Sequence, residues 1–404
     1  MFRIIELFKN ISKIIDMKVY KYGESPRINL KGFRKCTYYI IRVLIADLVR
    51  FFTFLKTLLL YCLELSRNMK ENHLGFFEKY LVLWVAICMV LGVIISQMLP
   101  GISEAIDSWQ ISGISIPIGI CLFLMMYPAM LNLQASEIKR LTKAPKPIIL
   151  TLFSNWIIAP IVGAFLASIF LSGNEQLIVA VILLSSSPCT AMVIVWGMLA
   201  DGNQEQNVIT TSINTVTIMF LYAPIVGILV GIQDISIDRV LLLISALIFI
   251  GLPLLSGVIS KRVLINRKGK EWFYEKYRPI VGKIAVTALL VTLIVLFTLN
   301  GYVLLQNPDK LVLISIPLLL GFGIVVSINV IITRIVNLEY KEAIITVIIG
   351  SSSHFEIAIA TAIAIFGVGS LAALGTTMGL FWEVPIMLGL VYFGKYLNRV
   401  GFWN

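Results

Sequence analysis

Long uncharged runs of apolar residues recur along this chain, and they constrain its fold more than any other feature. Each run is near the roughly 20 residues that a helix needs to cross a bilayer. None alternates strictly between polar and apolar residues, as a membrane β-strand would. The ten runs lie near residues 78–98, 114–132, 147–171, 177–200, 207–231, 240–260, 281–300, 311–333, 342–367 and 373–394. The chain is therefore predicted to be an all-α polytopic membrane protein with ten transmembrane helices.

The composition excludes a soluble fold. Hydrophobic residues make up 58% of the 404 residues and charged residues only 14%, which is more apolar surface than a globular protein of this size can bury. The five cysteines show no CxxC spacing, and only two histidines, His73 and His354, are present. A disulfide framework and a multi-histidine metal site are therefore not expected, and no cofactor is predicted.

Lysine and arginine in the loops predict the orientation. They gather after the second, sixth and eighth apolar runs and in the C-terminal tail, whereas most loops of the opposite parity contain few bases. The loop after the fourth run is an exception because it carries Asp201 and Glu205, but acidic residues contribute little to this rule. We expect a multi-pass protein of the cell membrane with both termini in the cytoplasm.

Residues 1–75 form a basic extension that differs from the rest of the chain. They contain 14 Lys/Arg and 6 Asp/Glu. The charges within residues 38–65 fall on one half of a helical circumference, which predicts an amphipathic helix on the anionic inner leaflet. An eleventh span remains an alternative, and it would place the extreme N-terminus on the opposite side of the membrane. No nucleic-acid-binding motif is visible, so nucleic acid is not an expected partner.

An internal repeat relates the two halves of the remaining chain. A shift of 166 residues aligns Ser185-Ser-Ser-Pro-Cys189 with Ser351-Ser-Ser-His-Phe355. The same shift carries the first five apolar runs approximately onto the last five. Because five is odd, the second half would enter the membrane with opposite polarity, as in many secondary transporters. The sequence predicts two inverted five-helix repeats, residues 76–238 and 239–399.

Both aligned segments have the composition of an interrupted helix. Pro188 lacks a backbone donor and clashes with the preceding turn, while Gly350 and the three serines weaken the ninth run at the equivalent depth. A lone proline would indicate only a kink. A matched pair of breaks indicates two crossing helices, the fourth and the ninth, with a binding site near the bilayer midplane.

Cys189 is the first candidate for that site. Its thiol favours soft, thiophilic species over hard cations such as sodium, and Ser187, Pro188 and Thr190 adjoin it. The alternative is that Cys189 behaves as a small buried hydrophobe, which is the interpretation we give to Cys88 and Cys121.

Glu356 and Glu383 are the two acidic residues predicted deep within spans, where an ionisable group usually serves a proton relay or an ion pathway. Pairing with a neighbouring donor is the structural alternative for each. His354 either titrates or, as a neutral imidazole, satisfies the broken backbone. Asn214 is favoured as functional because its span follows the first break, whereas Asn155 is equally well explained as a contact between helices.

The segments around these residues resemble the arsenical-resistance permeases. Ser187-Pro-Cys-Thr-Ala-Met-Val-Ile-Val-Trp196 is similar to their fourth-span signature, A-P-C-T-A-M-V-F-V-W. Similar matches follow in the second, ninth and tenth spans, at Ser115–Gly119 with Leu124–Pro128, at Phe355–Ala360 and at Trp382–Ile386. The resemblance covers residues 76–398 in order.

The resemblance implies membership of the bile acid/arsenite/riboflavin transporter superfamily and export of arsenite, sometimes antimonite, in exchange for protons. It places the essential cysteine at Cys189, the proton-coupling glutamates at Glu356 and Glu383, and a functional asparagine at Asn214. The substrate-binding group expected from the residues and the resemblance together is Ser187, Pro188, Cys189, Thr190, Asn214 and Phe355. His354 departs from the family pattern, which has asparagine there, and the basic extension has no counterpart in the family.

Two other functions remain as alternatives. The same fold could carry organic anions with sodium, although such a carrier would not need a thiol. An intramembrane hydrolase using a serine beside His354 is disfavoured because sequence adjacency does not give the geometry of a triad and no G-x-S-x-G elbow is present. We therefore expect a carrier and not an enzyme, with membrane lipids as partners and a homo-oligomer left open.

Overall fold

The computed structural model describes residues 81–99, 101–102, 105, 108–111, 114–131, 145–190 and 192–403. The predicted basic extension and its amphipathic helix lie outside the described residues. The description below concerns the unit formed by residues 71–404.

The ten predicted apolar runs are helical over most of their described length. The first five correspond to α4 (Leu81–Met98), α6 (Ile116–Leu131), α8 (Pro145–Phe153) with α9 (Ala159–Phe170), α10 (Glu175–Ser185) with α11 (Met192–Leu199), and α12 (Gln204–Ile232). The second five correspond to α13 (Arg239–Ala246) with α14 (Leu252–Lys268), α15 (Lys270–Trp272) with α16 (Arg278–Gln306), α17 (Pro308–Ile335), α18 (Tyr340–Ser351) with α19 (Phe355–Phe366), and α20 (Leu371–Arg399). Two strands, β1 (Gln110–Ile111) and β2 (Ile114–Ser115), pair as a short antiparallel ladder.

Among the described residues, six continuous helical stretches are long and apolar enough to cross a membrane. They are Pro145–Phe170, Gln204–Ile232, Arg239–Lys268, Lys270–Gly301, Pro308–Ile335 and Leu371–Arg399. Four shorter apolar helices accompany them. The chain is therefore an α-helical, multi-pass membrane protein, as its sequence predicts.

Three of the long helices contain one wide π turn, and a proline explains each. The π turns are η2 (Ser154–Ile158), η3 (Leu247–Gly251) and η4 (Phe273–Tyr277). Pro160, Pro253 and Pro279 follow them, each with its fourth preceding residue inside the π turn. A proline has no N–H and its ring clashes with the carbonyl four residues earlier, so the helix widens there instead of breaking.

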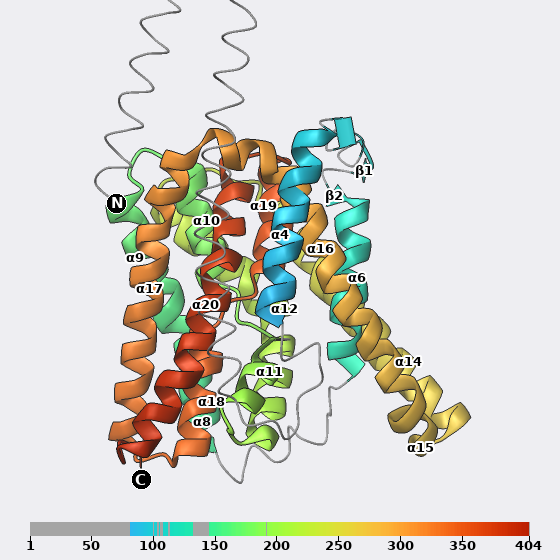
Figure 1. Ribbon diagram of the computed structural model, residues 1–404, viewed down its shortest axis with the longest axis vertical. Coiled ribbons are helices and arrows are strands. Elements are labelled where there is room, and N and C mark those ends of the chain that lie inside the picture. Colours follow the sequence, from blue (N-terminus) through green and yellow to red (C-terminus); the bar gives the residue numbers. More distant parts are fainter. Residues whose placement is uncertain are drawn as a thin grey trace, which may run out of the picture. The chain divides into compact units, whose positions relative to one another are not determined.

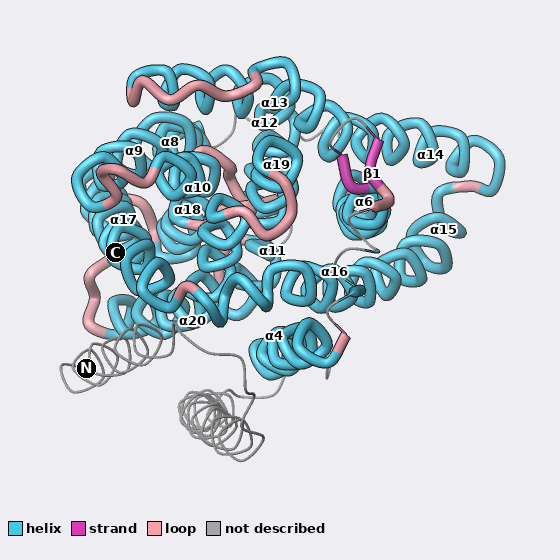
Figure 2. Tube along the Cα trace, turned by 90° about the horizontal axis from the view of Figure 1, so that it is seen from above, coloured by secondary structure: helices cyan, strands magenta, loops and turns pink. Residues whose placement is uncertain are grey.

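The helices form two packed groups (Figures 1 and 2). In one, α16 packs against α4 and α6, and α14 packs against α6. Small residues allow the close approach of α4 and α16, since a Cβ on Gly92 would lie 2.5 Å from Phe297 Cβ. The other group contains α9, α10 and α17 to α20. Here α10, α18 and α19 are buried over most of their length, so they form the centre of the group.

Candidate functional site

The two central helical pairs are both interrupted, and the interruptions meet. Helix α10 ends at Ser185 and the chain resumes as α11, while α18 ends at Ser351 and resumes as α19. We call residues 186–191 the first break and residues 352–354 the second break. Pro188 of the first break and Ser353 of the second form an antiparallel β-bridge. Segments separated by more than 160 residues are therefore in contact.

Backbone hydrogen bonds hold the two breaks together. The amide N–H of His354 donates to the carbonyl of Ser187 at 2.6 Å, and that of Cys189 donates to the carbonyl of Ser352 at 3.4 Å. An unsatisfied backbone group in a bilayer costs several kcal/mol. Each break thus supplies the partners that the other lost when its helix ended.

The first break and the helix beside it carry buried polar atoms with no hydrogen-bond partner in the described part of the chain. Thr190 and Asn214 are both fully buried, and Cys189 is 2% exposed. Ser186 Oγ, Thr190 Oγ1 and both amide atoms of Asn214 have no such partner. Native proteins leave few groups of this kind unsatisfied, so the first break and α12 beside it offer hydrogen-bonding groups that a ligand could use.

Asn214 lies at the level of the first break because of the register between α11 and α12. Asn207 Nδ2 donates to the carbonyl of Val193 at 3.1 Å. Asn214 is seven residues further along α12, on the same face and about two turns closer to the break. The structure therefore brings Asn214 to the side of α12 that faces α11 and the chain before it.

His354 and Glu356 form a buried pair at the start of α19. His354 Nδ1 lies 3.0 Å from Glu356 Oε2, and both side chains are almost completely buried. Neither imidazole nitrogen has a hydrogen bond of good angular geometry among the described residues. The two side chains are therefore close to each other, but their atoms are not oriented for a hydrogen bond. Both groups could bind a further ligand.

Glu383 on α20 holds the second break. Ser352 Oγ donates to Glu383 Oε1 at 2.5 Å, and the backbone N–H of Ser353 donates to the same oxygen at 3.1 Å. Ser353 Oγ donates to Glu383 Oε2 at 2.7 Å. The sequence singled out Glu383 but gave no role to these two serine hydroxyls, because nothing in a single chain shows which span faces which.

Further contacts fix the helix before the second break. Asn329 Nδ2 on α17 donates to Ser351 Oγ at 3.1 Å, and Ser154 Oγ on η2 donates to the carbonyl of Gly350 at 2.9 Å. Gly350 permits this approach, since a Cβ there would lie only 3.1 Å from Ser154 Cβ. The serine-rich segment is thus bonded from α17, α20 and η2.

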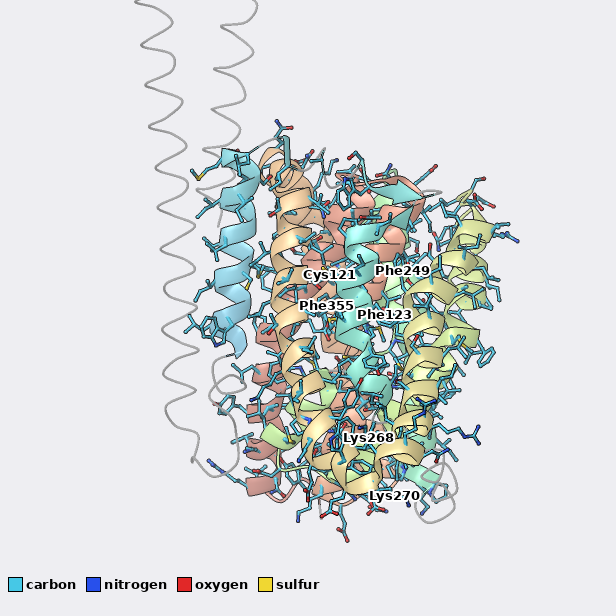
Figure 3. All side chains as sticks on the ribbon, turned by 90° about the vertical axis from the view of Figure 1, so that its right-hand side faces the viewer. Cys121, Phe123, Phe249, Lys268, Lys270 and Phe355 are labelled. Carbon is cyan, nitrogen blue, oxygen red and sulfur yellow. The ribbon has the colours of Figure 1, made fainter. Side chains whose placement is uncertain are left out.

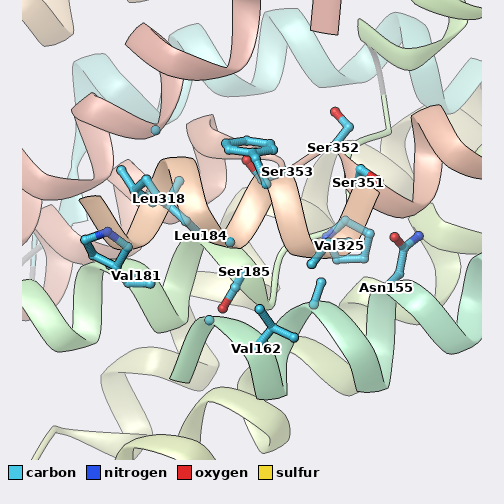
Figure 4. Close-up of a pocket in the computed structure, with 17 residues that line it drawn as sticks. Asn155, Val162, Val181, Leu184, Ser185, Leu318, Val325, Ser351, Ser352 and Ser353 are labelled. Atoms are coloured by element: carbon cyan, nitrogen blue, oxygen red, sulfur yellow. The ribbon is translucent and has the colours of Figure 1, made fainter. Parts of the chain in front are cut away.

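A cavity of about 60 Å³ lies beside the breaks, between α9, α10, α17 and α18 (Figure 4). Asn155, Ser185 and Ser351 are among its polar lining residues. Asn155 is 3% exposed, and its Nδ2 atom has no partner among the described residues. Such a volume has room for a few water molecules. Of the predicted substrate-binding residues only Pro188 lines it, so Cys189 and Asn214 belong to a separate group.

Phe355, which was predicted to bind substrate, and three tryptophans have packing environments. Phe355 is 2% exposed at the first turn of α19, and Trp196 is 2% exposed in α11. Trp156 Nε1 donates to Thr217 Oγ1 and Trp382 Nε1 to Ser315 Oγ. The described residues contain no group of three or more His, Cys, Asp or Glu that could hold a metal ion.

Comparisons with known proteins agree on one family. Residues 119–307 match the model of the sodium bile acid symporter family. The chain is 39% identical to an uncharacterized transporter of Synechocystis, over 82% of this chain and 90% of that protein. It is 36% identical to the arsenical-resistance protein Acr3 of Alkaliphilus metalliredigens, over 82% of this chain and 94% of the relative. It is 29% identical to the arsenical-resistance protein Acr3 of Corynebacterium glutamicum, over 80% of this chain and 90% of that relative.

The matches cover between 80% and 82% of this chain and between 90% and 94% of the three relatives. Similarity of this extent cannot arise from a shared apolar composition alone. The chain belongs to the arsenical-resistance permease family.

Proposed function

We propose that this protein exports arsenite from the cytoplasm as a secondary active carrier in exchange for protons. The observation that carries the proposal is the meeting of the two breaks, at a place where Thr190 Oγ1, next to Cys189 in the sequence, has no hydrogen-bond partner among the described residues. The names of the two Acr3 relatives supply the substrate class.

The proposal includes an architecture of two inverted five-helix repeats. The shift of 166 residues relates α10 and α11 to α18 and α19, and it relates α9 to α17 in the same way. Ten crossings with both ends in the cytoplasm would give the two halves opposite polarity. The four shorter apolar helices would complete crossings in this arrangement, two of them as halves of interrupted spans.

The thiol of Cys189 accounts for selectivity. Arsenic in arsenous acid is soft and neutral, so a sulfur ligand is favoured and no counter-charge is needed. In the proposed step the sulfur bonds to arsenic, one arsenic–oxygen bond breaks, and the thiol proton leaves with that hydroxyl as water. Hydrolysis on the other side reverses the step. Thr190 and Asn214 would bind the remaining hydroxyls, and Ser187, Pro188 and Phe355 would shape the site. Antimonite has the same chemistry and would compete.

The His354–Glu356 pair is the proposed proton carrier, with Glu383 as a second carboxyl that keeps the breaks in place. Ionisable groups buried within membrane spans usually serve a proton relay or an ion pathway. Exchange would follow if arsenite and the proton occupy this region alternately.

Arsenite accumulation in everted membrane vesicles tests the proposal. We expect uptake driven by an imposed pH gradient, and we expect Cys189→Ala to reduce it to background while the protein remains folded. Cys121→Ala is the matched control, since Cys121 is a half-buried thiol on α6, outside the breaks. Full transport by Cys189→Ala would remove the thiol from the mechanism.

Glu356→Gln tests the proton exchange separately. This variant keeps the size of the side chain but cannot release a proton. We expect arsenite to bind and equilibrate in both directions without dependence on the pH gradient. An unchanged response to the gradient would contradict a proton-carrying role for Glu356.

The family model favours one second candidate, which is cotransport with sodium. Oxygen atoms suit a hard cation, and Thr190, Asn214 and Glu356 supply them near the first break. The same vesicles, given a sodium gradient at constant pH, distinguish the two. Transport of an organic anion that requires sodium and ignores arsenite would favour this candidate.

A further inference from the structure

The segment that joins α14 to α16 is a strongly basic hairpin. Residues 261–283 contain eight Lys/Arg and two Asp/Glu. Helices α14 and α15 project beyond the neighbouring helices (Figure 1), and Lys268 and Lys270, labelled in Figure 3, lie at the turn between them. Trp272 and Tyr274 add aromatic rings of the kind that gather at membrane interfaces. We call residues 261–283 the basic hairpin.

The end of α6 packs into this hairpin and gives it a fixed shape. Leu131, Phe273 and Val281 form a buried apolar cluster. Tyr127 donates to Ser260 Oγ at 2.7 Å, and its hydroxyl lies 2.8 Å from that of Tyr277. The hairpin is therefore a framework whose surface features persist, and not a charged loop.

A cavity of about 300 Å³ opens beside this framework. It is lined by Pro128, Leu131, Tyr274, Arg278, Pro279 and Gly282. Its lining is apolar except for a phenol and one guanidinium. In the described part of the chain no carboxylate lies within ion-pair distance of Arg278. The guanidinium carbon lies 5.9 Å from the centroid of the Tyr274 ring.

Arg278 is the one charged residue among those that line this otherwise largely apolar cavity. Such an arrangement favours a ligand that carries a negative charge next to an apolar body. A phosphate fits the fork of a guanidinium, and acyl chains fit a lining of proline and leucine.

We propose that the cavity between α6 and the basic hairpin binds one anionic phospholipid, with its phosphate on Arg278 and its glycerol and acyl groups against Pro128, Leu131 and Pro279. The site is separate from the breaks and does not depend on which solute the protein carries. Basic pockets between membrane helices suit such headgroups. A zwitterionic lipid would bring an ammonium group toward the guanidinium of Arg278 and bind less well.

Native mass spectrometry of the full chain in detergent, titrated with phosphatidylglycerol or phosphatidylcholine, measures the site. We expect the anionic lipid to bind about tenfold tighter or better. Arg278→Gln should remove that preference. Arg267→Gln removes the same charge from an exposed position of the hairpin outside the cavity, and we expect it to retain most of the preference.

Gly282→Leu tests the cavity without changing a charge. A Cβ on Gly282 meets no atom within 4 Å, so the larger side chain would extend into the cavity while the helix tolerates it. We expect the preference to disappear, and this variant decides the question if Arg278→Gln does not fold. Normal binding to Gly282→Leu, an equal loss in Arg267→Gln, or displacement of the lipid by inorganic phosphate at equal concentration would each overturn the proposal.

Discussion

The two breaks follow segments that align in the sequence, but their polar side chains differ in the hydrogen bonds that they make. In the second break Ser352 and Ser353 both donate their hydroxyls to Glu383. In the first break Ser186 Oγ and Thr190 Oγ1 have no partner among the described residues. The second break is fixed by Glu383, whereas of the hydroxyls in the first break that of Ser187 alone has a hydrogen bond that the described residues provide, to the carbonyl of Leu184.

The helices before the breaks differ in the same way. The shift of 166 residues carries Gly163 onto Asn329 and Ser185 onto Ser351. Asn329 holds Ser351 with a hydrogen bond of 3.1 Å, whereas Gly163 brings α9 so close to Ser185 that a Cβ would overlap it. A pair of matched positions thus uses a polar contact in one half and close packing in the other. Symmetry of the chain does not imply symmetry of role.

Replacing Glu383 should have the largest effect on stability. Glu383→Ala leaves two hydroxyls and one backbone N–H of the second break without their acceptor, at about 1–3 kcal/mol for each buried group. We expect a loss of roughly 3–5 kcal/mol, seen as a lower unfolding temperature in detergent. Glu175→Ala, at an exposed carboxylate, should change stability by less than about 1 kcal/mol. Equal stability of the two variants would show that the second break does not depend on Glu383.

Gly163→Ala should have the next largest effect on stability. The added methyl group overlaps Ser185 Oγ and Cβ, so α9 and α10 must separate, at a cost of about 1–3 kcal/mol. Gly227→Ala is the control, since a Cβ there meets no atom within 4 Å and alanine favours the helix. We expect thermal unfolding to move down for the first variant and to stay or move up for the second. If Gly163→Ala leaves the unfolding temperature unchanged, close packing of α9 against α10 does not hold Ser185 in place.

Asn329→Ala should cost about 1 kcal/mol, because it removes one hydrogen bond to Ser351 Oγ. The same thermal measurement applies. The difference between Asn329→Ala and Glu383→Ala then gives the share of the second break that α20 supports. A loss as large as that of Glu383→Ala would mean that α17 and not α20 fixes this segment.

Thr190→Val should change stability least, by less than about 0.5 kcal/mol or in the favourable direction, because the hydroxyl that it removes has no partner among the described residues. Arsenite uptake into vesicles should nevertheless fall. Ser352→Ala provides the contrast, since it loses a hydrogen bond and should lower stability. If Thr190→Val unfolds as easily as Ser352→Ala, the two breaks are alike after all.

The sequence predicted the helical segments and the positions of both interruptions, because Pro188 and the serines after Gly350 act locally on the helix that contains them. It did not predict that Glu383 accepts from Ser352 and Ser353, since that contact joins different spans. It also did not predict that Asn155 and Asn214 lie in different surroundings. Both are buried amides, and only the packing of α9 against α17 puts the first into the cavity and leaves the second beside the first break. The π turns could have been predicted locally, because a proline follows each of them in the sequence.

The bridge between Pro188 and Ser353 has a consequence for motion. Because main-chain bonds connect the two interruptions, neither half of the polypeptide can shift there without dragging the other. If the proposed carrier function holds, a motion that exposes this spot first to one side of the membrane and then to the other would displace α10, α11, α18 and α19 together. The sliding surface would include the contact between α19 and α6.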